Sequence, residues 1–406
     1  MKKTFSILVI FGMFALAITA CTSKAEVPTG DITIQLWTQE GESDNAYQYV
    51  VSLTDAFTAM YPNITFEVVQ KDTETLREDF QTASLAGAAP DLLWTVSDHA
   101  GPFTTAGIIQ PVDDYFDMSL YVPSVVMDGK TWGVPISSGN HLMLLYNKDL
   151  IAEAPKDTDE MIAKGQELTH DDQYGLVFNS TEPFFIAPWW GGFGESVFAD
   201  DGVTPTLNNE AMVNTLQFLY DLKFTYEITP DSMDYDTADT LFKEGKAAML
   251  VNGDWSLGAY QEQFGDKLGV APLPMVTATG KYPAPYTSGK YFMLPKDLSG
   301  DKLNAVISFV EFATNEENQL NQLSILSRLP GLKSVLSNEA ISSDPILAGS
   351  SEAMSYGVPM PTVVEMRCIW DAIKPEQTLV FAGSETPADA AAAMQSAADA
   401  CILQLE

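Results

Sequence analysis

The sequence has few of the residues that hold metal ions or bind nucleic acid. Its 406 residues include only three His and three Cys, which leaves little room for a zinc or iron–sulfur site. The chain carries 21 Lys and Arg against 55 Asp and Glu, and its formal charge is −34. A protein this acidic is repelled by phosphate backbones, so nucleic acid is not an expected partner. No metal or other cofactor is expected.

Apolar residues, in contrast, are plentiful. The hydrophobic fraction is 46%, and 11% of the residues are aromatic, which is enough to build packed cores and argues against a disordered chain. Because single cores stop growing at about 250–300 residues, the length favours two or three core-forming units.

The N-terminus has the features of a secretory signal peptide over residues 1–20. Lys2 and Lys3 precede an apolar run that ends at Ala20, and small residues precede the expected cut. The tetrapeptide Ile18-Thr19-Ala20-Cys21 resembles the bacterial lipobox. That resemblance implies that Cys21 is lipidated, for example with palmitate, that residues 21–30 form a tether, and that the protein is anchored on the outer side of the cell membrane. Plain secretion and an uncut anchor are the alternatives.

The two other cysteines are Cys368 and Cys401. They fall in the last two predicted helices, in a compartment that permits disulfides. A bridge between packed helices and two separately buried thiols both remain open.

The first part of the mature chain predicts an α/β domain with a largely parallel sheet. Alternating apolar residues predict strands over 32–36, 64–68 and 91–94, while helical spacing predicts helices over 44–60 and 73–85. Strand–helix alternation of this kind is typical of α/β domains. Ligands bind at the carboxyl ends of the strands in such sheets, so residues 38–41 and 95–99 face the expected site.

The remainder predicts a second α/β region without an intervening linker. It contains a helix around residues 212–222, strands over 142–146, 247–251, 268–274 and 291–295, and four C-terminal helices over 301–314, 316–328, 362–374 and 387–405.

Several local strings occur together in one order along the chain. The most specific are Tyr146-Asn147-Lys148-Asp149 and the run from Gly245 to Trp255; the others include Ala89-Pro90-Asp91-Leu92, Gly129-Lys130-Thr131-Trp132-Gly133-Val134-Pro135, Glu182-Pro183-Phe184-Phe185, Ala271-Pro272-Leu273-Pro274 and Met360-Pro361 ten residues before Trp370. With them the chain resembles the extracellular solute-binding proteins of bacterial ABC transporters, in the sugar-binding family that contains the maltodextrin-binding proteins. The resemblance extends over nearly the whole mature chain.

This resemblance implies an α/β fold of two discontinuous lobes, like that of periplasmic binding proteins, with a hinged ligand cleft. Lobe one is expected over residues 31–138 and 288–338, and lobe two over residues 142–285 and 342–406. The implied protein is a monomer that captures a sugar or oligosaccharide in the cleft and delivers it to the permease subunits of the transporter.

The resemblance also implies three aromatic residues that stack on the ligand: Phe184, Trp255 and Trp370. Sugars present C–H faces to aromatic rings, and such sites combine rings with a few placed polar groups. Of the pair Trp189-Trp190, one residue is expected in the core and the other, taken as Trp190, in the cleft.

The polar positions match less completely. By resemblance, Asp98 and Glu182 stand at positions where the family has an acidic ligand residue, and His99 stands where an arginine is common. The acidic residue expected shortly before Asn140 is absent, and Asn140 could serve in its place. Glu40 is the nearest candidate for the polar ligand residue of the first loop. Thr95 stands where a stacking tryptophan is expected. These departures leave the sugar class in place and make maltose itself a weaker expectation.

Two other classes of function are alternatives to a sugar-binding protein. A glycoside hydrolase needs two carboxyl groups about 5–10 Å apart, but among 55 acids some such pair is nearly inevitable. No nucleophile elbow, His-Glu-x-x-His helix or phosphate loop is present, so an enzyme is not expected. A binder of another solute, such as a polyamine, peptide or metal, is the remaining alternative.

Overall fold

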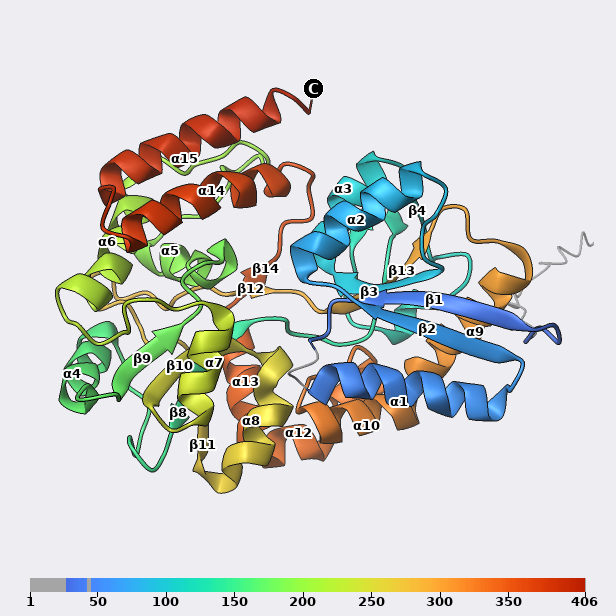
Figure 1. Ribbon diagram of the computed structural model, residues 1–406, viewed down its shortest axis with the longest axis horizontal. Coiled ribbons are helices and arrows are strands. Elements are labelled where there is room, and N and C mark those ends of the chain that lie inside the picture. The colour runs from blue at the N-terminus through green and yellow to red at the C-terminus, as the bar shows by residue number, and fades with distance from the viewer. Residues whose placement is uncertain (1–26, 42–44, 406) are drawn as a thin grey trace, which may run out of the picture.

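The computed structural model describes residues 27–41 and 45–405. The expected signal peptide, Cys21 and Asp44, the expected first residue of the helix over 44–60, therefore lie outside the described residues. Within them the chain forms two mixed α/β units side by side (Figure 1), each built on its own sheet. We refer to them as the first unit and the second unit.

The sheet of the first unit has the order β2-β1-β3-β13-β4, with β7 also pairing with β13. β1 is parallel to β2 and β3, whereas β13 is antiparallel to β3, β4 and β7. The expectation of a largely parallel sheet therefore holds for β1, β2 and β3 but is wrong for the pairings of β13. This strand comes from late in the chain and runs in the opposite direction. The bounds are β1 Ile32–Thr38, β2 Ile64–Gln70, β3 Leu92–Val96, β4 Ile109–Gln110, β7 Val134–Pro135 and β13 Lys290–Pro295.

Helices cover this sheet and close its core. The core beneath α1 is largely aromatic: the Phe57 ring lies 5.5 Å from that of Phe309 and 6.0 Å from that of Phe66. These helices are α1 Asn45–Met60, α2 Thr73–Leu85, α3 Ala100–Thr105, α9 Gly300–Ala313 and α10 Glu316–Leu326. Val27 also packs against this core, and the Asn63 amide donates to the Pro28 carbonyl at 2.9 Å. The last residues of the expected tether are thus fixed to the first unit.

The sheet of the second unit has the order β11-β8-β10-β9. Its central strand β10 is buried along its whole length, is parallel to β9 and is antiparallel to β8. The strands are β8 Leu142–Asn147, β9 Tyr174–Phe178, β10 Ala247–Gly253 and β11 Leu268–Ala271.

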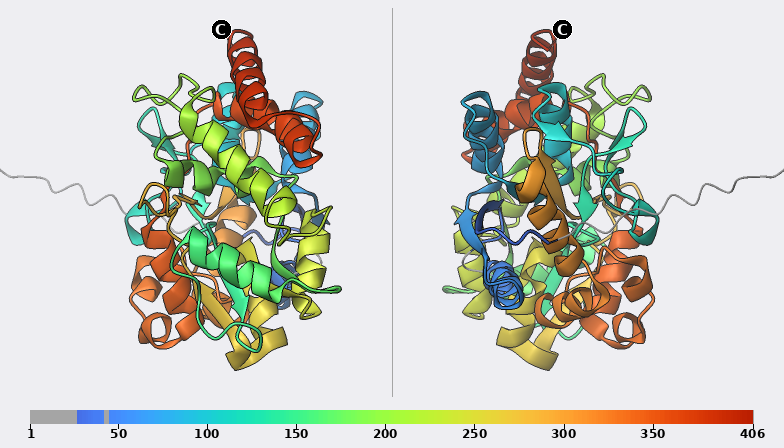
Figure 2. Two further views of the ribbon diagram at one scale, coloured as in Figure 1. Left: turned by 90° about the vertical axis from the view of Figure 1, so that its left-hand side faces the viewer. Right: turned by 90° about the vertical axis from the view of Figure 1, so that its right-hand side faces the viewer.

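The helices of the second unit come from the middle and the end of the chain. They are α4 Thr158–Leu168, α5 Ala187–Phe193, α6 Glu210–Phe224, α7 Tyr235–Lys243, α8 Leu257–Phe264, α13 Pro345–Ser355, α14 Met366–Phe381 and α15 Pro387–Ile402. Figure 2 shows α15 projecting at the end of the molecule where the chain ends. A disulfide between Cys368 and Cys401 joins α14 to α15, which decides the alternative that the sequence left open.

Helix α14 runs past the expected end at Lys374. Pro375 lies inside the helix, where it removes one backbone hydrogen bond. Its side chain is exposed, while Ile373, Gln377 and Val380 continue the buried face. Packing on that face outweighs the local cost of the proline.

Short elements connect these parts. They are the 3₁₀ turns η1 Ser97–His99, η2 Met118–Leu120, η3 Pro183–Phe185, η4 Asp254–Ser256 and η5 Gly265–Lys267, the strands β5 Val126–Met127, β6 Lys130–Thr131, β12 Tyr286–Thr287 and β14 Val358–Pro359, and the helices α11 Lys333–Leu336 and α12 Glu339–Ser343. In the described ranges no helix is long and apolar enough to cross a membrane.

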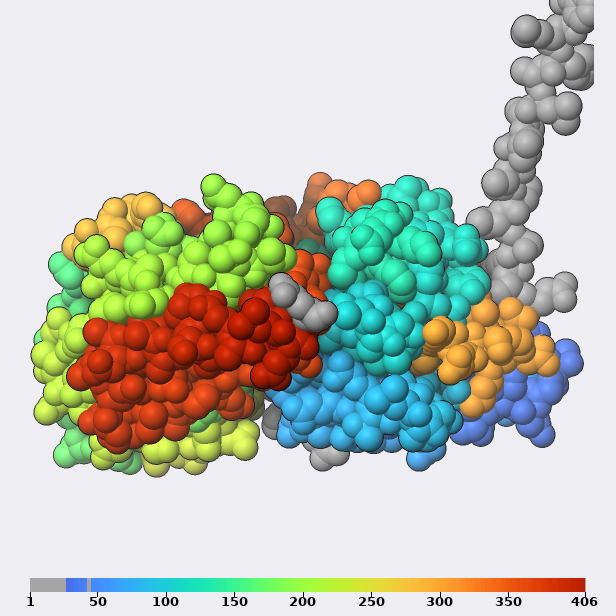
Figure 3. Space-filling model, turned by 90° about the horizontal axis from the view of Figure 1, so that it is seen from above, coloured from blue at the N-terminus to red at the C-terminus, as the bar shows by residue number. Residues whose placement is uncertain are grey.

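The chain passes between the two units more than once. Gly139, at the end of the first passage, pairs with Ser288 on the second, and β12 pairs with β14, just before α14. Seen from above, the two units meet along a seam with the C-terminal helices on one side (Figure 3). Two of the residues that the sequence singled out, Asp98 and Trp370, meet across this seam.

Candidate functional site

Three aromatic side chains from different elements of the second unit meet near the seam. The Phe184 ring lies 6.0 Å from the Trp255 ring and 6.5 Å from the Trp370 ring, measured between centroids. Phe184 and Trp255 stand on 3₁₀ turns that follow the parallel strands β9 and β10, and Trp370 stands on α14. All three side chains are only partly buried. The structure therefore gathers the three predicted aromatics into one partly open cluster.

A carboxylate of the first unit meets this cluster from the other side of the seam. The Trp370 Nε1 donates a hydrogen bond to Asp98 Oδ2 at 3.3 Å, and Asp98 stands on the 3₁₀ turn at the carboxyl end of β3. Burial raises the pKa of Asp98 to about 6, and the nearby Glu74 carboxylate adds to the rise. Asp98 is thus a carboxyl that titrates near neutral pH and bridges the two units.

Glu182 lies beside Phe184 in sequence and pairs with α14. Its Oε1 accepts from Lys374 Nζ at 2.5 Å, and both side chains are largely exposed. Lys374 lies four residues after Trp370, on the same face of the helix. The sequence reading missed Lys374, although its helical spacing from Trp370 was visible.

Two further polar residues of the first unit face this region. Arg77 is buried on α2 and pairs with Glu74 at 2.9 Å. Burial raises the pKa of Glu74, and Glu182 and Asp371 of the second unit raise it further. Their charges act on Glu74 because α2 approaches α14 across the seam. Sequence alone gave no sign of this, since α2 reads as an ordinary amphipathic helix.

Glu40 is placed differently from the expectation. It is 3% exposed, and its Oε1 accepts from Arg328 Nη1 at 2.6 Å and from Trp94 Nε1 at 2.9 Å. Although burial raises the pKa of Glu40, the Arg328 guanidinium, the Lys290 charge and the Trp94 hydrogen bond together hold that pKa below its ordinary value. Arg328 also donates to the Trp255 backbone carbonyl at 3.2 Å. The geometry gives Glu40 a structural role in a buried ion pair behind the aromatic cluster.

His99 is also buried. Its Nδ1 lies 2.7 Å from Thr95 Oγ1, and its Nε2 has no hydrogen-bond partner among the described residues. Burial lowers the pKa of His99 to about 3, so the ring is neutral at physiological pH. Thr95, which stands where a stacking ring was expected, instead orients this imidazole.

Asn140 sits on the passage between the units, in a left-handed conformation with φ of 46°. Its backbone N–H donates to Asp254 Oδ2 at 3.0 Å. A Cβ on the preceding Gly139 would lie 2.5 Å from the same oxygen, so only glycine allows the approach. The side-chain Oδ1 of Asn140 and the Oδ1 of Asp254 are buried without partners in the described part of the chain.

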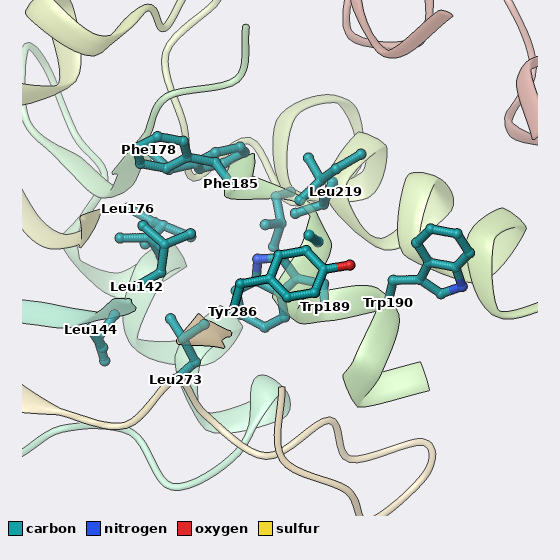
Figure 4. Packing of buried hydrophobic residues seen from close by; sticks show 14 of the residues in the cluster. Leu142, Leu144, Leu176, Phe178, Phe185, Trp189, Trp190, Leu219, Leu273 and Tyr286 are labelled. Carbon is teal, nitrogen blue, oxygen red and sulfur yellow. The ribbon is translucent and has the colours of Figure 1, made fainter. Parts of the chain in front are cut away.

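Trp190 corrects the expectation for the tryptophan pair. Trp189 and Trp190 are each 1% exposed, and both belong to the hydrophobic cluster of the second unit, with Leu219 and Tyr286 (Figure 4). Exposure therefore does not separate a core member from a cleft member. The short helix α5, on which both stand, packs against α6 and buries the two rings together.

Lys290 is a residue that the sequence reading missed. It begins β13, is 6% exposed, and its Nζ lies 5.7 Å from the centroid of the Trp255 ring. A single lysine at the start of a strand gives no sequence signal; only the pairing of β13 with β3 brings it here.

No metal site accompanies this cluster. Across residues 27–41 and 45–405, no group of three or more His, Cys, Asp or Glu side chains is arranged to hold a metal ion. A surface cavity of about 490 Å³ lies elsewhere, beside α15, with Val203, Val364 and Leu403 in its lining. The aromatic cluster takes no part in that cavity.

The chain is similar to known binding proteins over most of its length. Residues 52–349 match a family described as bacterial extracellular solute-binding protein. A solved maltose/maltodextrin-binding domain from Bdellovibrio bacteriovorus, bound to maltotriose, is 37% identical; the match covers 92% of this chain and 100% of that chain, with a TM-score of 0.88. A maltotriose-binding protein from Thermus thermophilus, bound to maltotriose, is 26% identical over 91% and 100% of the chains, with a TM-score of 0.84. A maltotriose-binding protein from Pyrococcus abyssi is 28% identical over 87% of this chain and 78% of its own.

Proposed function

The chain belongs to the bacterial extracellular solute-binding proteins, and from this premise we propose that it is the solute-binding component of an ABC importer for a maltodextrin-type sugar. In this proposal the sugar binds at the seam between the two units, and the closed complex delivers it to the permease. Membership of an extracellular family puts the site of action outside the cytoplasm.

The aromatic cluster carries this proposal. Phe184, Trp255 and Trp370 are partly exposed, and the Trp255 and Trp370 rings each lie within 6.5 Å of the Phe184 ring, which suits the C–H faces of successive glucose units. A carboxylate from the opposite unit, Asp98, stands beside them and can accept sugar hydroxyls. Aromatic faces next to a few convergent polar groups are typical of small-molecule sites.

The proposed ligand contacts divide by type. Phe184, Trp255 and Trp370 stack on sugar rings, while Asp98, Glu182 and Asn140 bind hydroxyl groups. His99 is neutral and offers its unpartnered Nε2. We assign Glu40 and Trp190 supporting roles behind this set, because the Glu40 carboxylate is held by Arg328 and Trp94, and because Trp190 belongs to the hydrophobic cluster of the second unit.

The two units correspond in this proposal to two lobes, residues 31–138 with 288–338 and residues 142–285 with 342–406. The residues of the two sheets and of their core clusters support the division. Hinge closure of two lobes on a ligand is a common mode of capture. A ligand that touches both lobes stabilises the closed form by its differential affinity for that state.

The lipid anchor on Cys21 completes the proposal. The lipobox-like tetrapeptide before Cys21 supports it, and tethering keeps the protein close to its permease, which raises the effective concentration. Mass spectrometry of the mature protein tests it: the proposal expects an acylated cysteine at the N-terminus, and an unmodified residue there would contradict it.

Tryptophan fluorescence tests the sugar proposal directly. We expect a saturable signal change with maltotriose and none with polyamines. Trp255→Phe and Trp370→Phe should reduce the change. Trp132→Phe is the matched control, since Trp132 packs in a separate core of the first unit and should leave the change intact. No response to any oligosaccharide at millimolar concentration would contradict the proposal, and a polyamine response would favour the alternative ligand class.

A further inference from the structure

Lys290 is held rigidly where the chain passes between the units. Its backbone N–H donates to Ser137 Oγ at 3.1 Å, and its carbonyl accepts from the Ile136 N–H at 2.8 Å. Both partners belong to the first passage, so Lys290 ties the two passages together. Its side chain is 6% exposed and extends toward the Trp255 ring, 5.7 Å from the ring centroid.

The ammonium group of Lys290 has no polar partner of its own. Among the described residues, neither a hydrogen bond nor an ion pair within 4.0 Å is formed by its Nζ, which lies 5.7 Å from the Trp255 ring centroid and feels the charges of Glu40 and Asp254. A lysine ammonium that is largely withdrawn from water and forms no hydrogen bond is unfavourable for stability. A methionine of similar length would fill the same space without that cost. The position is therefore expensive for stability, which points to a function.

Two unpartnered acceptors lie nearby: one is on Asn140, in the first passage, and the other is on Asp254, directly after β10. Asp254 is 1% exposed; its Oδ2 accepts from the Asn140 N–H, but its Oδ1 has no partner in the described ranges, and neither has the Oδ1 of Asn140. Asp254 directly precedes Trp255. Burial lowers the pKa of Lys290, and the charges of Glu40 and Asp254 act against that shift. A donor near the Trp255 ring thus lies within reach of the Asp254 charge, and Asp254 in turn contacts the backbone of Asn140.

We propose that Lys290, Asp254 and Asn140 form a polar subsite that binds neighbouring hydroxyl groups of the sugar ring stacked on Trp255. The inference rests on the proposed sugar-binding function and deepens it. A pyranose that lies flat on a ring directs its hydroxyls outward along its edge, where the Lys290 Nζ donates and the Asp254 and Asn140 oxygens accept. Because the ammonium and the Asp254 carboxylate balance in charge, the subsite selects a neutral diol over a uronate or an amino sugar.

The first test is calorimetry with maltotriose on Lys290→Met. We expect at least tenfold weaker binding, while the unfolding temperature of the free protein stays the same or rises, because an unpaired buried charge is removed. Lys296→Met is the matched control: Lys296 follows the end of the same strand, is exposed, and should leave affinity unchanged. If Lys290→Met fails to fold, Lys290→Gln, which keeps one donor, replaces it with an expected smaller loss of affinity.

Monodeoxy maltoses refine the test. Wild-type protein should bind each analogue more weakly than maltose wherever the missing hydroxyl is used. When the analogue lacks the hydroxyl that Lys290 binds, Lys290→Met should bind it with the same affinity as it binds maltose. Maltotriose binding with unchanged affinity in Lys290→Met, or misfolding of both Lys290 variants, would overturn the subsite while the proposed function stands. Absence of binding to the wild-type protein would overturn both.

Discussion

The hydrogen bond from Trp370 to Asp98 joins a stacking surface of one unit to a carboxyl group of the other. One ligand in contact with both residues would therefore touch both units. The Phe184 and Tyr286 rings lie 6.5 and 6.1 Å from the Trp370 ring and fix its orientation. At the scale of single residues, Trp370 is the side chain whose loss should separate binding from folding.

Trp370→Ala should weaken maltotriose binding at least fivefold, which corresponds to about 1 kcal/mol of lost stacking and burial. The fold should persist, because the ring is only partly buried. Calorimetry measures the affinity and circular dichroism the fold. Trp370→Phe is the control that keeps an aromatic face and loses the N–H donor. Its affinity for maltotriose should lie between those of the wild type and Trp370→Ala. Wild-type affinity in Trp370→Ala would remove this residue from the site.

Asp98 should make the stability of the protein depend on pH. Its pKa in the folded protein, about 6, lies above the ordinary value of a carboxyl because of burial. The folded state then binds more protons than the unfolded state between about pH 4 and 6, so the Asp98 contribution to the free energy of unfolding rises as the pH falls through 6. At about 1.4 kcal/mol per pKa unit, the change is at most about 3 kcal/mol. Urea denaturation of wild type and Asp98→Asn at pH 4.5 and 7.5 measures it; parallel profiles for the two proteins would contradict the shift.

Glu40→Gln separates a structural role from a ligand-binding role. The substitution leaves the Arg328 guanidinium buried without its carboxylate, and breaking a buried pair costs about 3–5 kcal/mol. We expect a large drop in the free energy of unfolding and less than about a threefold change in maltotriose affinity for the molecules that remain folded, a difference below 1 kcal/mol. Glu339→Gln, at an exposed position, should change neither. A large loss of affinity with unchanged stability would restore Glu40 as a ligand contact.

The residues of the site differ in how well their roles can be predicted from the sequence. Phe184, Trp255 and Trp370 stand in or near short strings of fixed order, so the resemblance located them. Lys290 and Arg328 carry no local signal, because their burial depends on strands and helices that meet only in the folded protein. Glu40 and Trp190 were read from their positions in a loop and a pair, and tertiary packing decided their burial.

At the scale of elements, most helices and strands that hydrophobic periodicity predicted lie within a few residues of the observed bounds, whereas α4, α8 and α13 were not predicted. Periodicity placed α1, α2 and α9 well because each has a regular apolar stripe. It did not give the direction of β13, because antiparallel and parallel pairing depend on the path of the chain rather than on local pattern. It also predicted that α14 ends at Lys374, before Pro375. Local propensity does not reveal the tertiary packing that stabilises the helix beyond the proline.

The disulfide between α14 and α15 should contribute strongly to stability. Cys368 and Cys401 are 33 residues apart, and closing a loop of that size stabilises by about 3–4 kcal/mol in the chain-entropy account. Cys401→Ser, or reductant added to wild type, should lower the free energy of unfolding by a similar amount. Reductant should have no effect on the double variant Cys368→Ser/Cys401→Ser. Identical denaturation curves for oxidised and reduced wild type would contradict this role.

At the scale of the whole molecule, two units with separate sheets and cores are joined by a few passages, by packing of α8 against α10 and by polar contacts across the seam. One further contact of this kind is Asn45 to Glu262, at 3.0 Å. Two units that have separate cores and are joined by a few passages are suited to hinge motion. The acidic surface is consistent with a solvated exterior, and neutral ligands do not depend on it.

Ligand binding should bring the two units together. Spin labels at Leu85→Cys on α2 and Leu379→Cys on α14, both exposed, report their separation. We expect the distance distribution to shift to shorter values with maltotriose. A label pair within the first unit, Leu85→Cys with Leu120→Cys, is the control and should not change. A distance distribution between Leu85→Cys and Leu379→Cys that does not change with maltotriose would contradict closure.

A crystal structure of the mature protein with maltotriose tests the central claim most directly. The account predicts glucose rings at the seam, stacked on Phe184, Trp255 and Trp370, with hydroxyl groups within hydrogen-bond distance of Asp98. Maltotriose bound away from these side chains, or no bound sugar at millimolar concentration, would contradict it.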